Sequence, residues 1–153
     1  MTLPELVAFD LDGTFWKRKA SGQLALRPYI EKIMKYLHIN GVDMAVCSNH
    51  DDEQEAKDFF KQTTIDIKSR KRTLMSLIKP GCFVIQSGNK NAHFQTVKKK
   101  SGVSYSDMLF FDDDPDNGNV EEDKGVNFIE VGQPGLDWET FKRGLKVYNQ
   151  EQQ

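Results

Sequence analysis

The sequence has few cysteines, no long apolar run and no marked excess of either charge, and each absence excludes a class of protein. Its only cysteines, Cys47 and Cys82, lie inside apolar runs, which favours a reducing compartment and two thiols in the core. The 21 basic residues nearly balance the 23 acidic ones, so no general affinity for nucleic acid or anionic membranes is expected. No stretch approaches the roughly 18 apolar residues that a membrane span needs.

The N-terminal segment 1–9 lacks the basic flank and the long apolar region of a signal peptide, and we expect a cytoplasmic protein with no membrane partner. The 153 residues suit one domain with one core. No internal repeat is present, and no linker rich in proline, glycine or serine marks a second domain. We therefore expect a single domain over residues 1–153, with a frayed tail at 149–153. The oligomeric state is left open.

Short apolar runs alternate with segments of helical periodicity, which is typical of a parallel sheet covered by helices on both faces. The sequence therefore predicts a three-layer α/β fold with a mainly parallel central sheet. The expected strands are Leu3–Phe9, Val42–Cys47, Cys82–Gly88, Met108–Phe111 and Val126–Val131. The expected helices start near Pro28, near Asp51, at Lys90 and at Asp137. Residues 17–27 are expected to form a polar loop, and residues 63–81 a short strand and a helical turn.

Polar residues follow the ends of the expected strands. Asp10 and Asp12 follow the first strand, Ser48 and Asn49 the second, and Asp112, Asp113 and Asp114 the fourth, while the third leads to Lys90. Ligands of open α/β sheets collect outside the carboxyl ends of the strands. We therefore expect these side chains to gather at one edge of the sheet.

Several carboxylates at one edge require a compensating charge. Two carboxylates at ~4 Å repel each other by about 4 kcal/mol at an effective dielectric constant near 20. Because the group contains oxygen ligands without histidine or thiolate, it favours Mg²⁺ over Zn²⁺. Protein-bound Mg²⁺ commonly keeps contacts with substrate phosphate oxygens, which points to phosphoryl chemistry.

The stretch Asp10-Leu11-Asp12-Gly13-Thr14 suits such chemistry. In an extended chain, residues i and i+2 project on the same face, so Asp10 and Asp12 can address one substrate. We expect Asp10 to attack phosphorus and Asp12 to act as general acid and base. Gly13 lets the backbone N–H groups approach a phosphate, and Thr14 is expected to pin the turn through its hydroxyl.

With these residues in view, the sequence resembles the haloacid dehalogenase (HAD) superfamily. The D-x-D-x-T motif at Asp10, the strand-end Ser48, the helix-opening Lys90 and the acidic pair Asp112-Asp113 match its four motifs in order. Small magnesium-dependent phosphatases of that superfamily are the most similar, because they share the tryptophan of DGTFW, the K-x-x-H-F pattern and the F-F-D-D-x-x-x-N run.

The resemblance implies a role for each matched residue. Mg²⁺ would be held by Asp10, the backbone carbonyl of Asp12 and Asp113, and Ser48 and Lys90 would grip the phosphoryl group. Three further residues would act indirectly, by contacting the residues that bind metal and substrate or through water molecules: Asp112, Asn117 and His93. Substrate contacts are expected from Gly13, Thr14, Asn49 and Trp16, although packing of Trp16 over the core is equally compatible with the sequence. His50, just past Asn49, is expected to be an exposed loop residue, with a contact to substrate as the alternative.

Residues 13–47 separate Asp12 from Ser48, and a predicted helix occupies many of them. Too few residues remain for a cap domain, so we expect an open site that admits a bulky or macromolecular phosphate, such as a phosphoprotein, a sugar adduct or a nucleic-acid end. Activity of acid-phosphatase or phosphotyrosine type is compatible with this site. Two alternatives stay open: a catalytically silent module that binds metal and phosphate, and a phosphoryl or phosphoglyceryl transferase of the same superfamily.

Overall fold

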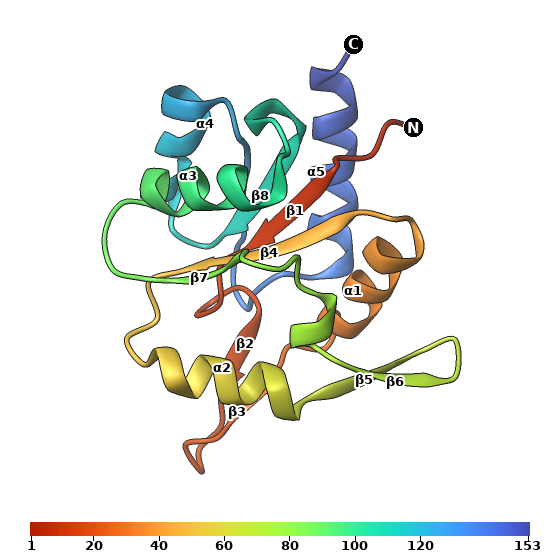
Figure 1. Ribbon diagram of the computed structural model, residues 1–153, viewed down its shortest axis with the longest axis vertical. Helices are drawn as coiled ribbons and strands as arrows, with labels where there is room; N and C mark the ends of the chain where they lie inside the picture. The colour runs from red at the N-terminus through yellow and green to blue at the C-terminus, as the bar shows by residue number, and fades with distance from the viewer.

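The computed structural model describes residues 1–153, and its centre is a five-stranded sheet in the order β7-β4-β1-β8-β9 (Figure 1). The strands are β1 (Leu6–Phe9), β4 (Asp43–Ser48), β7 (Phe83–Ile85), β8 (Met108–Asp112) and β9 (Asn127–Glu130). Every pair of neighbouring strands is parallel. The predicted parallel sheet is therefore confirmed, and β1 lies in its middle, between β4 and β8.

Helices cover both faces of the sheet, which confirms the three-layer α/β architecture. They are α1 (Ile30–Ile39), α2 (Glu53–Gln62), α3 (Lys90–Ser101), α4 (Asn119–Lys124) and α5 (Trp138–Glu151). Successive strand residues face opposite layers: Val7 and Phe9 of β1 pack in the core with α1 and α5, whereas Leu6 and Ala8 pack in the core with α3 and α4. Both cysteines are fully buried, as predicted.

Two antiparallel hairpins interrupt the α/β pattern, and the sequence did not predict either. One pairs β2 (Trp16–Arg18) with β3 (Leu24–Leu26), where a polar loop was expected. The other pairs β5 (Thr64–Ile67) with β6 (Arg70–Thr73), and a 3₁₀ turn follows at Met75–Leu77. The second strand of this hairpin is polar, so no alternation of apolar residues marked it.

Element boundaries differ from the predictions at several points. The first strand begins at Leu6 instead of Leu3, α1 begins at Ile30 instead of near Pro28, and the short helix α4 was not predicted. The start of α2 agrees with the prediction: Asp52, next to Asp51, caps the helix by accepting a hydrogen bond from the N–H of Glu55. Helix α5 continues to Glu151, and Asn149 accepts a hydrogen bond from the N–H of Thr2 (2.8 Å), so most of the expected frayed tail is helical.

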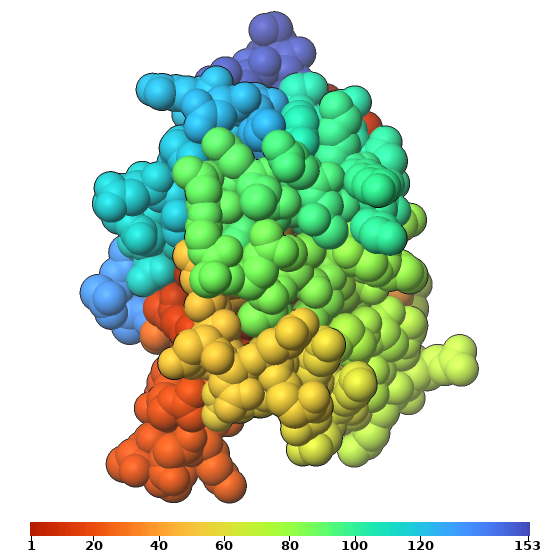
Figure 2. All heavy atoms as spheres, turned by 60° about the vertical axis from the view of Figure 1, so that its left-hand side comes forward, coloured from red at the N-terminus to blue at the C-terminus, as the bar shows by residue number.

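The segment between β1 and β4 contains only the β2–β3 hairpin and α1, and no cap domain covers the sheet. In Figure 2 this hairpin (orange) forms a small projection beside α2 (yellow). None of the helices combines the length and the apolar character that crossing a membrane requires.

Candidate active site

A pocket of about 240 Å³ opens at the carboxyl ends of β1, β4 and β8, and all ten residues that line it are polar. The lining residues are Asp10, Asp12, Ser48, Asn49, His50, Lys90, Asp112, Asp113, Asp114 and Asn117. The parallel strand order therefore gathers the strand-end residues at one edge, as the sequence predicted.

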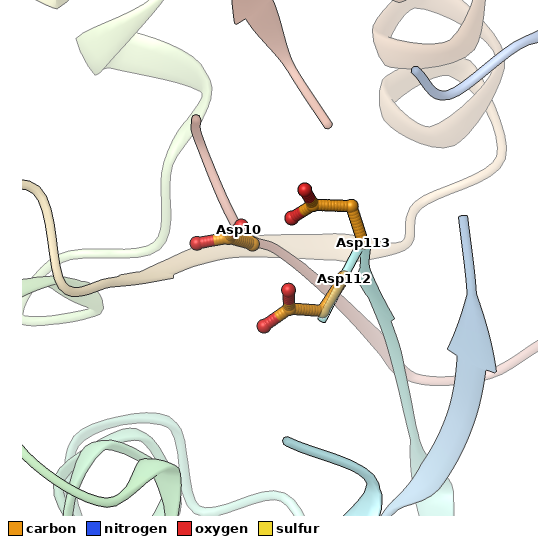
Figure 3. A group of neighbouring side chains, drawn as sticks. All are labelled: Asp10, Asp112 and Asp113. Carbon is orange, nitrogen blue, oxygen red and sulfur yellow. The ribbon is translucent and has the colours of Figure 1, made fainter. Parts of the chain in front are cut away.

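Three aspartates from the two neighbouring strands β1 and β8 meet in this pocket (Figure 3). Carboxylate oxygens of Asp10, Asp112 and Asp113 lie within 4.8 Å of one another. The backbone N–H of Asp10 donates to the carbonyl of Phe111 (3.0 Å), so the parallel ladder holds the ends of both strands together. This arrangement concentrates negative charge where Asp10 and Asp112 are buried.

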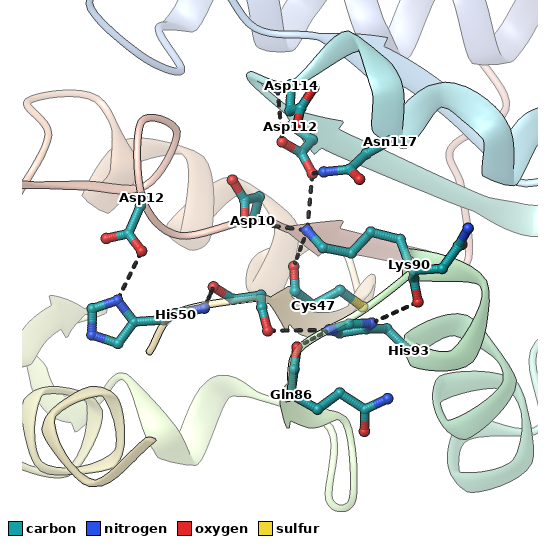
Figure 4. A network of polar contacts seen from close by, with 12 residues as sticks. Asp10, Asp12, Cys47, His50, Gln86, Lys90, His93, Asp112, Asp114 and Asn117 are labelled. Carbon is teal, nitrogen blue, oxygen red and sulfur yellow. Dashed lines mark hydrogen bonds and ion pairs between the residues drawn. The ribbon is translucent and has the colours of Figure 1, made fainter. Parts of the chain in front are cut away.

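Lys90 brings one positive charge into the cluster from the first residue of α3 (Figure 4). Its Nζ lies 3.0 Å from Oδ2 of Asp112 and 3.3 Å from Oδ1 of Asp10, and it donates to the carbonyl of Cys47 (3.1 Å). Burial alone would lower the pKa of Lys90, but the two carboxylates outweigh it and raise that pKa. The ammonium group therefore stays charged although the side chain is only 1% exposed.

Asp112 has hydrogen-bond donors on both carboxylate oxygens. Its Oδ2 accepts from Lys90 and from the Asn117 amide (2.7 Å), and its Oδ1 accepts from the backbone N–H of Asp114 (2.9 Å). Among the three clustered aspartates, these contacts leave Asp10 and Asp113 as the ones with free carboxylate oxygen atoms. Asp112 thus orients Lys90 and Asn117 at the buried end of the cluster.

The charge of the cluster is not balanced by Lys90 alone. Burial is the main cause that raises the pKa of Asp10 to about 8; Lys90 opposes this rise, and the neighbouring Asp112 and Asp113 contribute to it. Burial also raises the pKa of Asp113. A second cation beside Asp10 and Asp113 would offset this repulsion, and a donor set made only of oxygen atoms fits a hard divalent ion such as Mg²⁺.

Gly13 and Thr14 are not among the residues that line the pocket. Gly13 has a φ of +79°, and a Cβ atom there would collide with the carboxylate of Asp113. Gly13 therefore allows Asp113 to approach the turn. The prediction that Thr14 pins the turn through its hydroxyl is wrong, because its buried Oγ1 has no hydrogen-bond partner.

Asp12 projects to the other side of the pocket, toward His50 (Figure 4). His50 Nδ1 lies 2.8 Å from Oδ2 of Asp12, and its Nε2 lies 2.9 Å from Glu55 of α2. The expectation that His50 is an exposed loop residue is therefore wrong: it is 8% exposed. Burial opposes protonation of the ring, but hydrogen bonds to Asp12 and Glu55 prevail and raise the pKa of His50.

Trp16 contacts Asp12 instead of the substrate pocket. Its indole Nε1 donates to Oδ1 of Asp12 (2.8 Å), and the side chain is 1% exposed. Its ring packs edge-on against His50 and Phe59. The structure thus supports the packing interpretation of Trp16 over a stacking surface for substrate.

Hydrogen bonds connect the end of β4 with α3 and with the residue that follows β7. They involve Ser48, Asn49 and His93. Ser48 Oγ accepts from the backbone N–H of His50 (3.0 Å), which leaves its own hydroxyl proton free for the pocket. The Asn49 amide faces the carbonyl of Gln86 and, oriented to donate, lies 2.9 Å from it. His93 is buried, and its Nε2 lies 3.1 Å from the carbonyl of Ser48 and 2.9 Å from that of Gln86. His93 therefore fixes the backbone behind the pocket.

Comparison with known families agrees with this geometry. A family model described as Acid Phosphatase matches residues 17–151. The chain belongs to the acid phosphatase family. This phosphatase is 28% identical to human "Magnesium-dependent phosphatase 1", over 98% of the chain and 90% of that protein. It is also 28% identical to a HAD-like hydrolase superfamily protein of Schizosaccharomyces pombe, over 83% of the chain and 85% of that protein.

Solved structures share the fold. The N-terminal part of a Bacteroides fragilis protein, which contains a phosphatase domain and is complexed with Mg, has a TM-score of 0.69 at 22% identity, over 96% of this chain and 40% of that one. A HAD family enzyme of Bacteroides thetaiotaomicron, in complex with magnesium and inorganic phosphate, has a TM-score of 0.69 at 11% identity, over 90% and 98% of the two chains. The resemblance to the HAD superfamily is thereby confirmed, and the chain is a small HAD-type phosphatase.

Sequence reasoning missed the contact of His50 with Asp12, and it missed Glu55 and Arg18, which lie beside the candidate site and support His50. Arg18 lies on β2 and forms two hydrogen bonds of 2.9 Å with Glu55, which in turn contacts His50. The only signal in the sequence was a histidine two residues after Ser48, followed by acidic residues at a helix start. Nothing in that local pattern indicates contact with Asp12.

Proposed function

We propose that the chain is a Mg²⁺-dependent phosphomonoester hydrolase that forms an aspartyl phosphate on Asp10. The observation that carries the proposal is the meeting of Asp10, Asp113 and Lys90 in a pocket without apolar lining. The family match and the names of the magnesium-containing relatives support it. Asp10, Asp113 and the backbone carbonyl of Asp12 would hold the metal ion. When bound, Mg²⁺ supplies positive charge that favours the Asp10 carboxylate and the phosphoryl oxygens.

In the first step, a carboxylate oxygen of Asp10 forms a bond to phosphorus while the bond from phosphorus to the leaving oxygen breaks. Asp12 gives its proton to that oxygen, so the product leaves as an alcohol. Lys90 and the Ser48 hydroxyl hold the phosphoryl oxygens during the transfer. Asp10 then carries the phosphoryl group, and Asp12 is a carboxylate.

In the second step, Asp12 removes a proton from water as the water oxygen attacks phosphorus. The bond between phosphorus and Asp10 breaks, and its electron pair returns to the Asp10 carboxylate. Inorganic phosphate leaves, and Asp12 again carries the proton for the next cycle. Asp112 and Asn117 keep Lys90 oriented in both steps without touching the substrate.

The proposed substrates are bulky or macromolecular phosphates, such as phosphoproteins, sugar adducts or nucleic-acid ends. Two observations support this class: no cap domain lies over the pocket, and the pocket, of about 240 Å³, has no apolar lining residue that would bind the rest of an organic substrate. The rest of the substrate would then lie on the outer surface of the protein. Because an open site excludes water poorly, modest rates on small esters are expected.

A phosphate-release screen tests the proposed function. Purified protein would be incubated with phosphoproteins, sugar phosphates and phosphorylated nucleic-acid ends, with Mg²⁺ and with EDTA. We expect release that EDTA abolishes and restored Mg²⁺ recovers, and that is fastest on the macromolecular group. No release from any substrate would favour the catalytically silent module. Isotope-labelled phosphate that ends on an acceptor instead of water would favour a transferase.

A further inference from the structure

Both carboxylate oxygens of Asp12 are engaged by donors from different parts of the chain. Trp16 Nε1 lies 2.8 Å from Oδ1, and His50 Nδ1 lies 2.8 Å from Oδ2. The two donors are buried, whereas the Asp12 side chain itself is 58% exposed. An exposed side chain on a turn otherwise samples several rotamers. These two contacts therefore set the direction in which Asp12 points.

His50 is itself held at three points. Its Nε2 lies 2.9 Å from Oε1 of Glu55, and its backbone N–H donates to Oγ of Ser48 (3.0 Å). The ring also packs edge-on against Trp16, with centroids 5.3 Å apart. With one carboxylate at each ring nitrogen, the ring cannot turn without losing a hydrogen bond to Asp12 or to Glu55.

The support continues into the β2–β3 hairpin. Arg18 of β2 contacts both oxygens of Glu55 at 2.9 Å, a paired geometry that restricts a carboxylate in two directions. Glu55 lies in the first turn of α2, whose start is capped by Asp52. A continuous series of contacts thus runs from Arg18 through Glu55 and His50 to Asp12. Lys90 and Asp112 are not part of it.

We propose that His50 is the positioning residue for Asp12, and that Glu55 and Arg18 hold His50 in place. The inference rests on the proposed function, in which Asp12 transfers the proton to and from the reacting oxygen atoms. Displacement of a catalytic group by about 1 Å can reduce a rate by about 10²-fold. Loss of His50 would therefore slow the steps that need the Asp12 proton. It would spare the attack of Asp10 on an ester whose leaving group departs as a stable anion.

Variants of His50 and two aryl esters test this proposal. His50→Phe keeps an aromatic ring beside Trp16 but removes both ring donors, and His50→Gln keeps one donor. We expect His50→Phe to lower kcat/KM for phenyl phosphate by about 10²-fold, and for 4-nitrophenyl phosphate by less than about threefold, because the second leaving group needs little protonation. His50→Gln should recover part of the loss.

Matched controls separate this role from a general loss of structure. His38→Gln changes a histidine of α1 outside the pocket, and Glu53→Gln changes an acid of the same α2 turn that pairs only with Lys57. Both controls should leave both rates unchanged. Glu55→Leu should reproduce the selective loss on phenyl phosphate, because it frees the far side of the His50 ring.

The rates of wild type and variants on the two esters show whether the proposed function or only the role of His50 has failed. A wild-type enzyme that hydrolyses neither ester overturns the proposed function itself. An active wild type whose His50→Phe variant loses activity equally on both esters, or not at all, overturns only the role of His50.

The contact between His50 and Asp12 is checked independently by nitrogen NMR of the histidine rings. Asp12→Ala should shift the His50 signals, and unchanged signals would contradict the proposal.

Discussion

The Lys90 ammonium and the Asp112 carboxylate form an ion pair of 3.0 Å in which neither side chain is more than 1% exposed. Asp10 shares the same ammonium group at 3.3 Å. Such a pair is costly to desolvate but far more costly to break on one side, because the remaining charge is left buried. The pair is thus both part of the candidate site and a condition for a stable fold.

Lys90→Met should destabilise the protein strongly. Removing the cation leaves two buried carboxylates uncompensated, and we expect a loss of about 3–5 kcal/mol in the free energy of unfolding, measured with urea. Lys79→Met is the control, because its 3.6 Å pair with Asp43 is more than a third exposed, and it should cost less than about 1 kcal/mol. Equal costs for the two variants would contradict the buried-pair interpretation.

Asp10→Asn should abolish turnover of 4-nitrophenyl phosphate while the protein stays folded. The amide cannot form the proposed acyl phosphate, but it keeps nearly the same shape and can still accept a hydrogen bond from Lys90. Initial rates and circular dichroism would be measured side by side, with Asp66→Asn on the exposed face of β5 as control. An Asp10→Asn enzyme with most of the wild-type activity would show that another group attacks phosphorus.

Gly13→Ala should weaken Mg²⁺ binding by about tenfold, because the new Cβ displaces Asp113. Gly41→Ala is a close control: its φ of +71° is almost as strained as the +79° of Gly13, but a Cβ at Gly41 meets no atom within 4 Å. Both variants should lose stability, and only Gly13→Ala should need more Mg²⁺ for half-maximal activity. The same Mg²⁺ requirement in both would remove the inferred role of Gly13.

The contacts of Glu55 should make stability depend on pH in the acid range. Hydrogen bonds from Arg18, followed by those from His50, lower the pKa of Glu55 from 4.5 to about 2 in the folded protein. The resulting stabilisation is present above the unfolded pKa and is lost as the pH falls toward the folded pKa. The stability difference between wild type and Glu55→Gln should therefore shrink between pH 4.5 and 2. Unfolding with urea at each pH measures it, with Glu53→Gln in the same helical turn as the control variant.

Neither cysteine should react with iodoacetamide in the folded protein. Burial raises the pKa of Cys47 and of Cys82, and both side chains are fully inaccessible to solvent. Mass spectrometry should find no alkylated cysteine under native conditions and two after unfolding in urea. Rapid modification of Cys47 in the native state would mean that the layer between β4 and α3 opens readily.

The sheet and the clustered acids were predictable because their signals are local. Each central strand is a short apolar run, and the rules for parallel sheets place the following residues at one edge. Lys90 was predicted because it follows the third expected strand and opens a helix, as in the third motif of the superfamily that the sequence resembles. These features need no knowledge of which distant residues touch.

The hairpins and the contacts of His50 were not predictable, because they depend on tertiary partners. Strand β6 is largely polar and is paired only because β5 lies beside it with Ile65 and Ile67 buried. His50 contacts Asp12, which lies 38 residues earlier in the chain. A local pattern of one histidine and several acids is equally compatible with an exposed loop.

Because β1 lies in the middle of the sheet, the candidate active site can be completed only late in synthesis of the chain. Until residues 108–113 have left the ribosome, β1 has a neighbour only on the β4 side, and the acids of β8 are missing from the pocket. The unpaired edge of β1 then offers free N–H and C=O groups to other chains. A chain that ends before that point is expected to aggregate and to be inactive. During synthesis, the unpaired edge of β1 is therefore the part of the chain that most needs protection from other chains.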